Sequence, residues 1–166
     1  MDPTWGVLGR LKTMGVRGSE LRFGRGEFLY VMDNDGYYTQ GWDTYASEAA
    51  TKAGLVGPYR HPYHHPTENS FSLSNGKMFK ECLSVQGIGH MMQWGVWDEC
   101  GPYQGSVEGT NKGEDHELVR RVADSGALVG VVDPDVVYNC GLTDSYGNPC
   151  VGIETMGERR EGVYYE

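Results

Sequence analysis

The sequence predicts a single α/β domain, with βαβ units in its middle and irregular, turn-rich segments at both ends. Short apolar runs of strand length alternate with segments whose apolar residues recur at helical spacing. These helical segments are about ten to fifteen residues long, as in parallel βαβ units. The length of 166 residues suits one domain, residues 1–166. A reduced or incomplete barrel is one arrangement of such units.

The first half of the chain supplies two expected helices and two expected strands. Helical spacing between Trp5 and Arg17 predicts a helix, weakened by its glycines. A short apolar run ends at Met32 and is followed by an Asp-Asn-Asp-Gly turn, which predicts a strand. A second helix is expected at 42–53 and a second strand at 55–59. The apolar residues of the first helix, which fall close to one stripe, are Val7, Leu8, Leu11, Met14 and Val16.

The second half repeats this pattern more faintly. A helix is expected at 77–85 and a strand at 91–97. Residues 115–124 predict the clearest later helix, because their apolar side chains share one face. A strand is expected at 127–132, and residues 139–166 form a turn-rich tail.

The composition indicates a thin aliphatic core. Val, Leu, Phe and Ile together make up just under one fifth of the chain. A share below about 20% with high net charge is typical of disorder or of a core that a partner completes. The 11 Tyr, the 4 Trp and a charged share of 22% argue against disorder. We therefore expect other protein subunits to complete the interior.

Charge and hydropathy exclude several classes of partner. The formal charge is −9, and Lys and Arg are not clustered, so we expect no nucleic-acid partner. No apolar stretch is as long as the roughly 18 residues that a membrane-crossing helix needs, so no membrane span is expected. The first residues lack a basic region followed by an apolar run, so no secretory signal is expected. The cellular location stays open.

Three histidines lie within five positions, at His61, His64 and His65. Imidazole is the commonest metal ligand in proteins, so a metal-binding domain is one hypothesis. The alternative is a surface loop held extended by prolines, with its imidazoles stacked on Tyr59 and Tyr63. We favour this loop, and we expect no metal or other cofactor.

The cysteines leave two alternatives open. Cys140 and Cys150 flank nine residues around a Gly-Asn-Pro turn, so a disulfide closing a hairpin is sterically plausible. In an oxidising compartment such a bond would stabilise the fold by about 2–4 kcal/mol. Buried thiols at all four cysteines are the other alternative. The sequence has no Cys-x-x-Cys, so no thioredoxin-type or zinc-ribbon site is indicated.

A family resemblance covers residues 28–138. Phe28-Leu29-Tyr30-Val31, Asp35-Gly36 and Ala53-Gly54-Leu55-Val56-Gly57-Pro58-Tyr59 follow one another, and Val96-Trp97-Asp98-Glu99 comes later. This order resembles the muramidases of glycoside hydrolase family 25. The resemblance implies a small or degenerate cell-wall glycan hydrolase, with Glu99 as the acid and Asp98 or Asp35 as its partner. The family spaces its acidic pair as Asp-x-Glu, whereas these two acids are adjacent and would point to opposite sides of a strand.

The leading hypothesis is a non-catalytic subunit that packs into a larger protein assembly, such as a virion or a multi-subunit complex. Tyr and Trp are enriched where proteins bury surface against one another. The muramidase-like hydrolase is the alternative, and the histidine-based metal domain is a weaker one. Any of the aromatic residues could instead be core, Trp42 above all. The expected binding residues are Tyr37, Tyr38, Trp42, Tyr59, Tyr63, Trp94, Trp97 and Tyr103.

Overall fold

The computed structural model describes residues 7–32, 36–38, 41–57, 69–82, 85, 89–104, 113–133 and 137–139. Its helices are α1 (Val7–Phe23), α2 (Trp42–Ala50), α3 (Trp94–Cys100) and α4 (Glu114–Asp124). Its strands are β1 (Phe28–Met32), β2 (Gly36–Tyr38), β3 (Leu55–Gly57), β4 (Ser70–Ser72), β5 (Met78–Glu81), β6 (Gly89–Gln93), β7 (Val129–Asp133) and β8 (Val137–Asn139). The α/β class is confirmed.

The main sheet has six strands in the order β1-β6-β3-β7-β5-β4. Strand β3 runs parallel to β7, and the other described pairs of this sheet are antiparallel. The described strands therefore do not form the expected series of parallel βαβ units. The sheet is open, with β1 and β4 at its edges, and β2 pairs with β8 in a separate two-stranded sheet.

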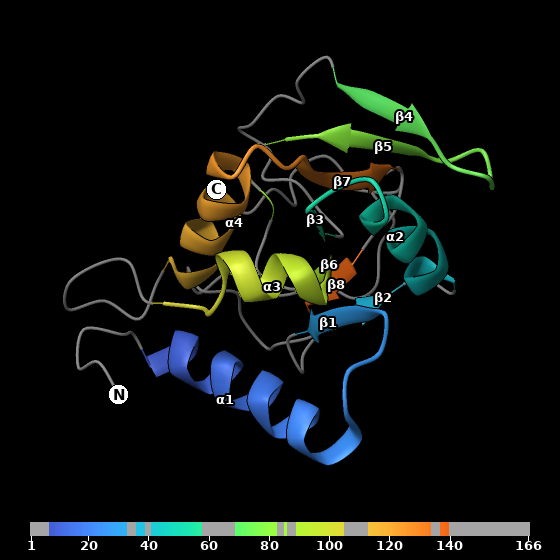
Figure 1. The fold of residues 1–166 in the computed structure, drawn as a ribbon. Helices are drawn as coiled ribbons and strands as arrows, with labels where there is room; N and C mark the ends of the chain where they lie inside the picture. Colours follow the sequence, from blue (N-terminus) through green and yellow to red (C-terminus); the bar gives the residue numbers. More distant parts are fainter. Residues whose placement is uncertain are drawn as a thin grey trace.

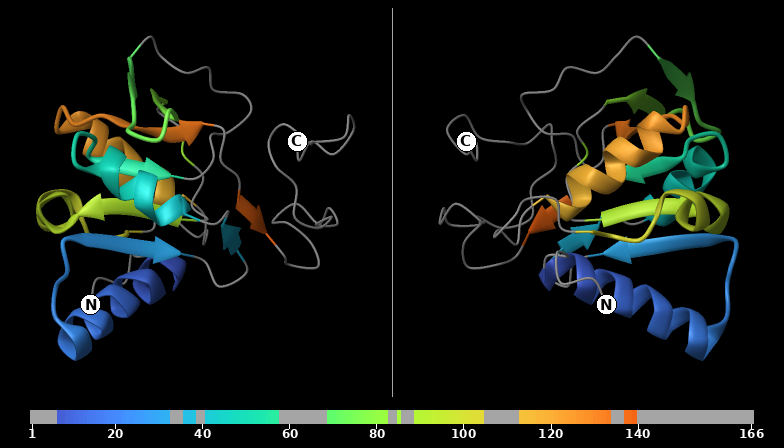
Figure 2. Two further views of the ribbon diagram at one scale, coloured as in Figure 1. Left: turned by 90° about the vertical axis from the view of Figure 1, so that its right-hand side faces the viewer. Right: turned by 60° about the vertical axis from the view of Figure 1, so that its left-hand side comes forward.

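The helices cover both faces of the main sheet, as Figures 1 and 2 show. Because side chains alternate along a strand, neighbouring strand residues belong to different core clusters. Leu55 and Met92 pack in the cluster that includes side chains of α1, α3 and α4. Val56 and Met91 pack with α2 on the opposite face. Helix α1 lies beside β1, at one edge of the sheet (Figures 1 and 2).

In the first half, the expected elements are confirmed with shifted ends, but the expectation of an irregular, turn-rich N-terminal segment is wrong, because Val7–Phe23 forms one regular helix. The first helix continues beyond Arg17 to Phe23, and Gly24, with φ +75°, follows its end. The amide of Gly24 donates to the carbonyl of Glu20 over 2.8 Å, as in a glycine-terminated helix. Strand β1, helix α2 and strand β3 lie within or close to the ranges that the sequence indicates.

Two predictions in the second half are wrong. The helix expected at 77–85 is instead strand β5, whose register pairs it with both β4 and β7. Phe79 is fully buried between these neighbours, so pairing and burial override the local helical spacing. The strand expected at 91–97 ends at Gln93, where α3 begins. Helix α4 and strand β7 are confirmed, and the tail after Asn139 lies outside the described residues.

Candidate interaction surface

The structure buries four of the aromatic side chains expected to bind a partner. Trp42 and Tyr103 are 1% exposed, and Trp94 and Trp97 are 9% and 8% exposed. These side chains pack in the core of this chain. They fill space that the few aliphatic side chains do not fill. These four side chains thus belong to the core, which is the alternative that the sequence left open for them.

The remaining expected binding residues are placed only in part. Tyr37 and Tyr38 lie on β2, opposite Tyr138 and Val137 of β8. Tyr59 and Tyr63 lie outside the described residues. The same is true of one candidate acid, of the three candidate metal-binding histidines and of the two cysteines of the expected disulfide: Asp35, His61, His64, His65, Cys140 and Cys150. In the part of the chain that the structure describes, no group of three His, Cys, Asp or Glu residues is placed to hold a metal.

The acidic pair at 98–99 lies on helix α3 and is exposed. The Arg25 guanidinium donates to both carboxylate oxygens of Asp98, over 2.6 and 2.9 Å. The hydrogen bonds from Arg25 lower the pKa of Asp98, and Coulomb attraction adds to the effect. A carboxylate that assists glycan cleavage must face the sugar or its attacking water, whereas both oxygens of Asp98 face Arg25. Asp98 therefore acts as an ion-pair partner for the segment that follows α1.

Helix α1 turns its more apolar side outward. Gly9, Thr13 and Val16, at helical spacing, are buried on its inner side. On the outer side, Leu11 and Met14 are 57% and 56% exposed. The predicted stripe is thus divided, with Leu11 and Met14 on the outer side and Val16 on the inner side; the side chains of Val7 and Leu8 lie outside the described part.

Two further apolar side chains of α1 are exposed: Leu21 on the outer side, and Phe23 at the helix end, seven residues after the buried Val16. Leu21 is 88% exposed, and Phe23, at the very end of α1, is 76% exposed. Met32 of β1, 49% exposed, is the fifth large exposed apolar side chain in the described part of the chain. Four of these five therefore belong to one helix. We call Leu11, Met14 and Leu21, together with Phe23 at the helix end, the α1 outer face.

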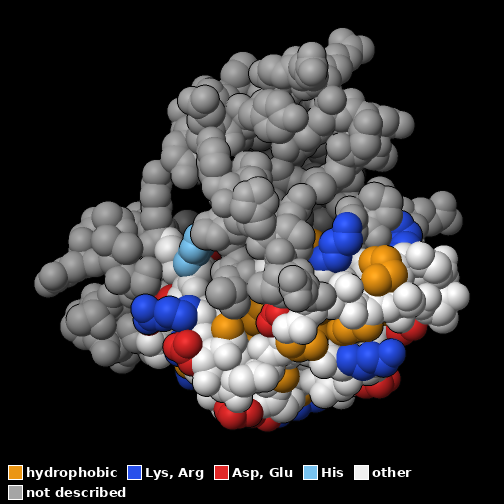
Figure 3. All heavy atoms as spheres, turned by 90° about the horizontal axis from the view of Figure 1, so that it is seen from above, with side chains coloured by type: hydrophobic (Ala, Val, Ile, Leu, Met, Phe, Trp, Pro, Cys, Tyr) orange, Lys and Arg blue, Asp and Glu red, His pale blue; other side chains and the backbone are white. Residues whose placement is uncertain are grey.

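Apolar side chains also reach the surface around the β4 edge (Figure 3). Viewed from that side, the apolar side chains of the described residues lie among acidic and basic ones (Figure 3). The α1 outer face gathers large apolar side chains on a single element.

Polar contacts hold the inner side of α1 in place. The Thr13 hydroxyl donates to the carbonyl of Tyr103 over 3.2 Å. Lys12 Nζ lies 3.2 Å from a carboxylate oxygen of Glu114 on α4, and these side chains are 15% and 7% exposed. The same ammonium lies 5.5 Å from the centre of the Tyr103 ring. These contacts fix which side of α1 faces outward.

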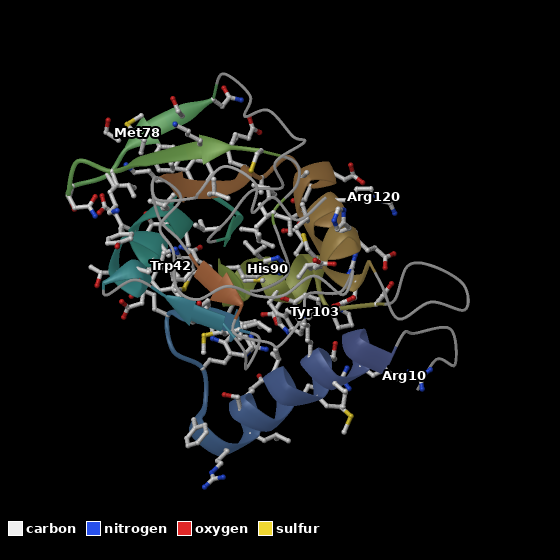
Figure 4. All side chains as sticks on the ribbon, turned by 180° about the vertical axis from the view of Figure 1, so that it is seen from behind. Arg10, Trp42, Met78, His90, Tyr103 and Arg120 are labelled. Carbon is white, nitrogen blue, oxygen red and sulfur yellow. The ribbon has the colours of Figure 1, made fainter. Side chains whose placement is uncertain are left out.

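Tyr103 connects this anchor to the sheet. Its hydroxyl lies 2.8 Å from Nδ1 of His90 on β6, and both side chains are fully buried or nearly so. The two rings are stacked, with centroids 5.9 Å apart, and lie in the interior in Figure 4. Arg121 of α4 donates to the carbonyls of Cys100 and Pro102, which holds the backbone leading to Tyr103. Burial lowers the pKa of Arg121.

A second anchor lies at the end of α1. Arg25 donates to Glu20 over 2.6 Å as well as to Asp98. Its guanidinium lies 4.6 Å from the ring centre of Trp94 on α3. The hydrogen bonds to Asp98 and Glu20 raise the pKa of Arg25, so it stays charged. Helix α1 is therefore tied to α3 and α4 along its length.

The sequence contained a signal for the α1 outer face, but it was weak. Leu11, Met14 and Leu21 recur at i, i+3 and i+10, the spacing of one helical face. Because the helix predicted from the sequence ends at Arg17, it does not include Leu21. The sequence also does not show that the side of the helix with Thr13 and Val16 is the buried one.

Comparison with known proteins adds no family to these observations. No protein-family model matches the sequence, and no curated protein matches it either. Among the described residues, no helix is both long and apolar enough to cross a bilayer.

Proposed function

We propose that this chain is a non-catalytic subunit of a larger protein assembly and that it docks through the α1 outer face. The observation that carries the proposal is the exposure of Leu11, Met14, Leu21 and Phe23 on a helix whose buried side is more polar. Leu11, Met14 and Leu21 share one helical face, and an exposed apolar patch marks a protein interaction site. The proposal moves the contact from the aromatic loops to α1.

The magnitudes support an interaction role for this face. Fully burying a Leu, Met or Phe side chain is worth about 1.5–3 kcal/mol, so covering the exposed parts of these four adds roughly 4–8 kcal/mol. Association itself costs about 4–15 kcal/mol, so the interface must extend beyond α1. Met, Phe and Arg are also residue types enriched at interfaces. The four side chains therefore supply the apolar centre of a larger contact.

The anchoring of α1 favours binding, because a preformed helix loses little conformational freedom when it docks. Thr13, Lys12 and Arg25 hold α1 through contacts to Tyr103, Glu114 and Asp98. None of these three contacts uses a side chain of the α1 outer face. The face is thus presented on a fixed support.

The hydrolase and the metal-binding domain stay predictions, because no contact among the described residues supports either of them. The hydrolase alternative, with a reduced or incomplete barrel, would use Glu99 as the acid and Asp98 or Asp35 as its partner. Asp98 pairs with Arg25 and its pKa is lowered, and Asp35 lies outside the described residues. The metal alternative depends on histidines outside the described residues.

Sedimentation of the chain expressed in its source tests the proposal. The wild-type chain should sediment as a species well above the mass of a single chain. Leu21→Arg should shift it toward the monomer, because a charge then occupies the apolar centre. Since Leu21 is 88% exposed and Arg forms helices as well as Leu, the folding free energy should change by less than about 0.5 kcal/mol.

Met32→Arg is the matched control, because Met32 is an exposed apolar residue outside α1. It should leave the sedimentation unchanged. A wild-type chain that is monomeric in its source, or equal shifts for both variants, would contradict docking through α1.

A further inference from the structure

We infer that the α1 outer face docks on an acidic surface of a second copy of this chain, in a head-to-tail contact. This inference rests on the proposed function, since it names the partner of the same face. The distribution of charge along the chain identifies this partner.

The charge of the chain is strongly divided. Residues 7–26 contain five basic and one acidic side chain, a net charge of +4. The rest of the chain contains nine basic and 22 acidic side chains, a net charge of −13. Outside residues 7–26, a second copy therefore carries an excess of the charge that attracts α1, and complementary potentials favour association.

Arginines lie beside the exposed apolar residues of α1. Arg17 and Arg22 are both exposed. By helical geometry, Arg17 is next to Met14 and Leu21, three and four residues away. The Arg22 guanidinium lies 5.2 Å from the centre of the Phe23 ring. The apolar centre thus has guanidinium groups at its margins, where they would meet carboxylates of a partner. Arginine is well suited to such pairs because its planar group binds carboxylates bidentately.

The same charges disfavour a symmetric contact between two α1 helices. A two-fold contact sets the same surface of both copies together, so both meeting faces would carry Arg17, Arg22 and the excess positive charge of residues 7–26. Like charges placed across an interface oppose association. The acceptor must therefore lie elsewhere on the chain. Besides Asp98, which pairs with Arg25, the exposed acids on other parts of the described chain are Glu27, Asp43, Glu99 and Asp124.

A contact between two different surfaces has a distinct consequence for assembly size. Each copy keeps one unused donor face and one unused acceptor face, so addition continues until a ring closes or a filament grows. A symmetric contact would stop at two chains. The inference therefore predicts assemblies larger than dimers from the purified chain.

The first measurement is sedimentation velocity of the purified chain between about 1 and 200 µM, the range in which weak association becomes visible by mass action. Average mass should rise with concentration. Salt at about 1 M shortens the Debye length to about 3 Å and should weaken the association at least tenfold. Arg17→Glu combined with Arg22→Glu should abolish it, whereas Arg120→Glu, an exposed arginine on α4, should not.

A mixing experiment tests the head-to-tail geometry. A tagged Leu21→Arg chain lacks a working donor face but keeps its acceptor, so a few-fold excess should bind wild-type chains and reduce their assemblies to small capped species. In a symmetric α1–α1 contact, the variant would not bind wild type at all. Retention of large wild-type assemblies without incorporated variant would overturn the inference.

Two further outcomes would also overturn it. One is a purified wild-type chain that stays monomeric over the whole concentration range. The other is Leu21-dependent binding to phosphatidylserine-containing vesicles without self-association, which would assign the face to an anionic membrane. If the purified chain is monomeric but the chain in its source forms an α1-dependent complex, self-docking fails and the proposed function stands. If both are monomeric, both fail.

Discussion

Replacing Lys12 by Met tests whether polar contacts hold α1 in its observed orientation. The Lys12 ammonium lies 3.2 Å from the Glu114 carboxylate, and the side chains are only 15% and 7% exposed. Methionine retains most of the apolar stem and removes the charge. Glu114 then remains in a poorly hydrated site without the ammonium that neutralises it.

The magnitude follows from this burial. Removing one partner of a fully buried ion pair costs about 3–5 kcal/mol, and slight exposure reduces this to about 2–4 kcal/mol. The lost contact between the ammonium and the Tyr103 ring, 5.5 Å away, belongs to the same total. Against a typical domain stability of about 5–15 kcal/mol, the change is readily measured.

Urea unfolding of Lys12→Met, Glu114→Gln and the double variant completes a double-mutant cycle. The double variant should be destabilised less than the sum of the single variants, with a coupling of about 1–3 kcal/mol. Hydrogen exchange should show that amides in α1 lose more protection than those in α2. A single-variant effect below about 0.5 kcal/mol with additive free energies would refute the reasoning.

Three further predictions follow from other parts of the structure. Phe79→Ala should lower the unfolding free energy by about 3–5 kcal/mol, because the side chain is 0% exposed and stacked on Phe71; a loss below about 1 kcal/mol in urea unfolding would contradict this packing. Asp98→Asn should be less stable than wild type at neutral pH. Because Arg25 lowers the pKa of Asp98 in the folded chain, the difference is full above the unfolded-state value of 3.8 and shrinks as the pH falls below it; a pH-independent difference in urea midpoints would exclude the ion pair. Glu99→Gln should leave cell-wall clearing by the chain at the level of wild type, and loss of a measurable wild-type activity would favour the hydrolase.

The sequence predicts the elements with strong local patterns. Helices α2 and α4 combine helical apolar spacing with glycine-rich ends, and β1 is a short apolar run before a turn, so local chemistry and tertiary packing agree. The α/β class follows from these elements. The thin aliphatic content is also informative, since Trp42, Trp97 and Tyr103 fill the core in place of aliphatic side chains.

The predictions at β5 and α3 were wrong because long-range pairing decides both. Met78–Glu81 becomes a strand because β4 and β7 lie on either side of it. Strand β7 lies far along the sequence, beyond helices α3 and α4, and no local pattern marks it as the neighbour of β5. Trp94 and Trp97 lie three positions apart, which suits a helix with one buried face.

The interaction surface could not be predicted from composition. Aromatic abundance indicated exposed rings, but Trp94 and Tyr103 are buried. The inner side of α1 is fixed by contacts that join distant residues, such as Thr13 with Tyr103 and Arg25 with Asp98. From the sequence alone, these contacts are not visible, and either side of α1 could be the buried one.

Methionine oxidation measures the central claim directly, because the chain carries two matched probes. Met14 of the α1 outer face is 56% exposed and Met32 of β1 is 49% exposed, so both should form sulfoxide at similar rates in dissociated chains. In the assembly, peptide mass spectrometry after brief peroxide treatment should show Met14 protected several-fold and Met32 oxidised as before. Equal oxidation of Met14 in assembled and dissociated chains would show that α1 is not the docking face.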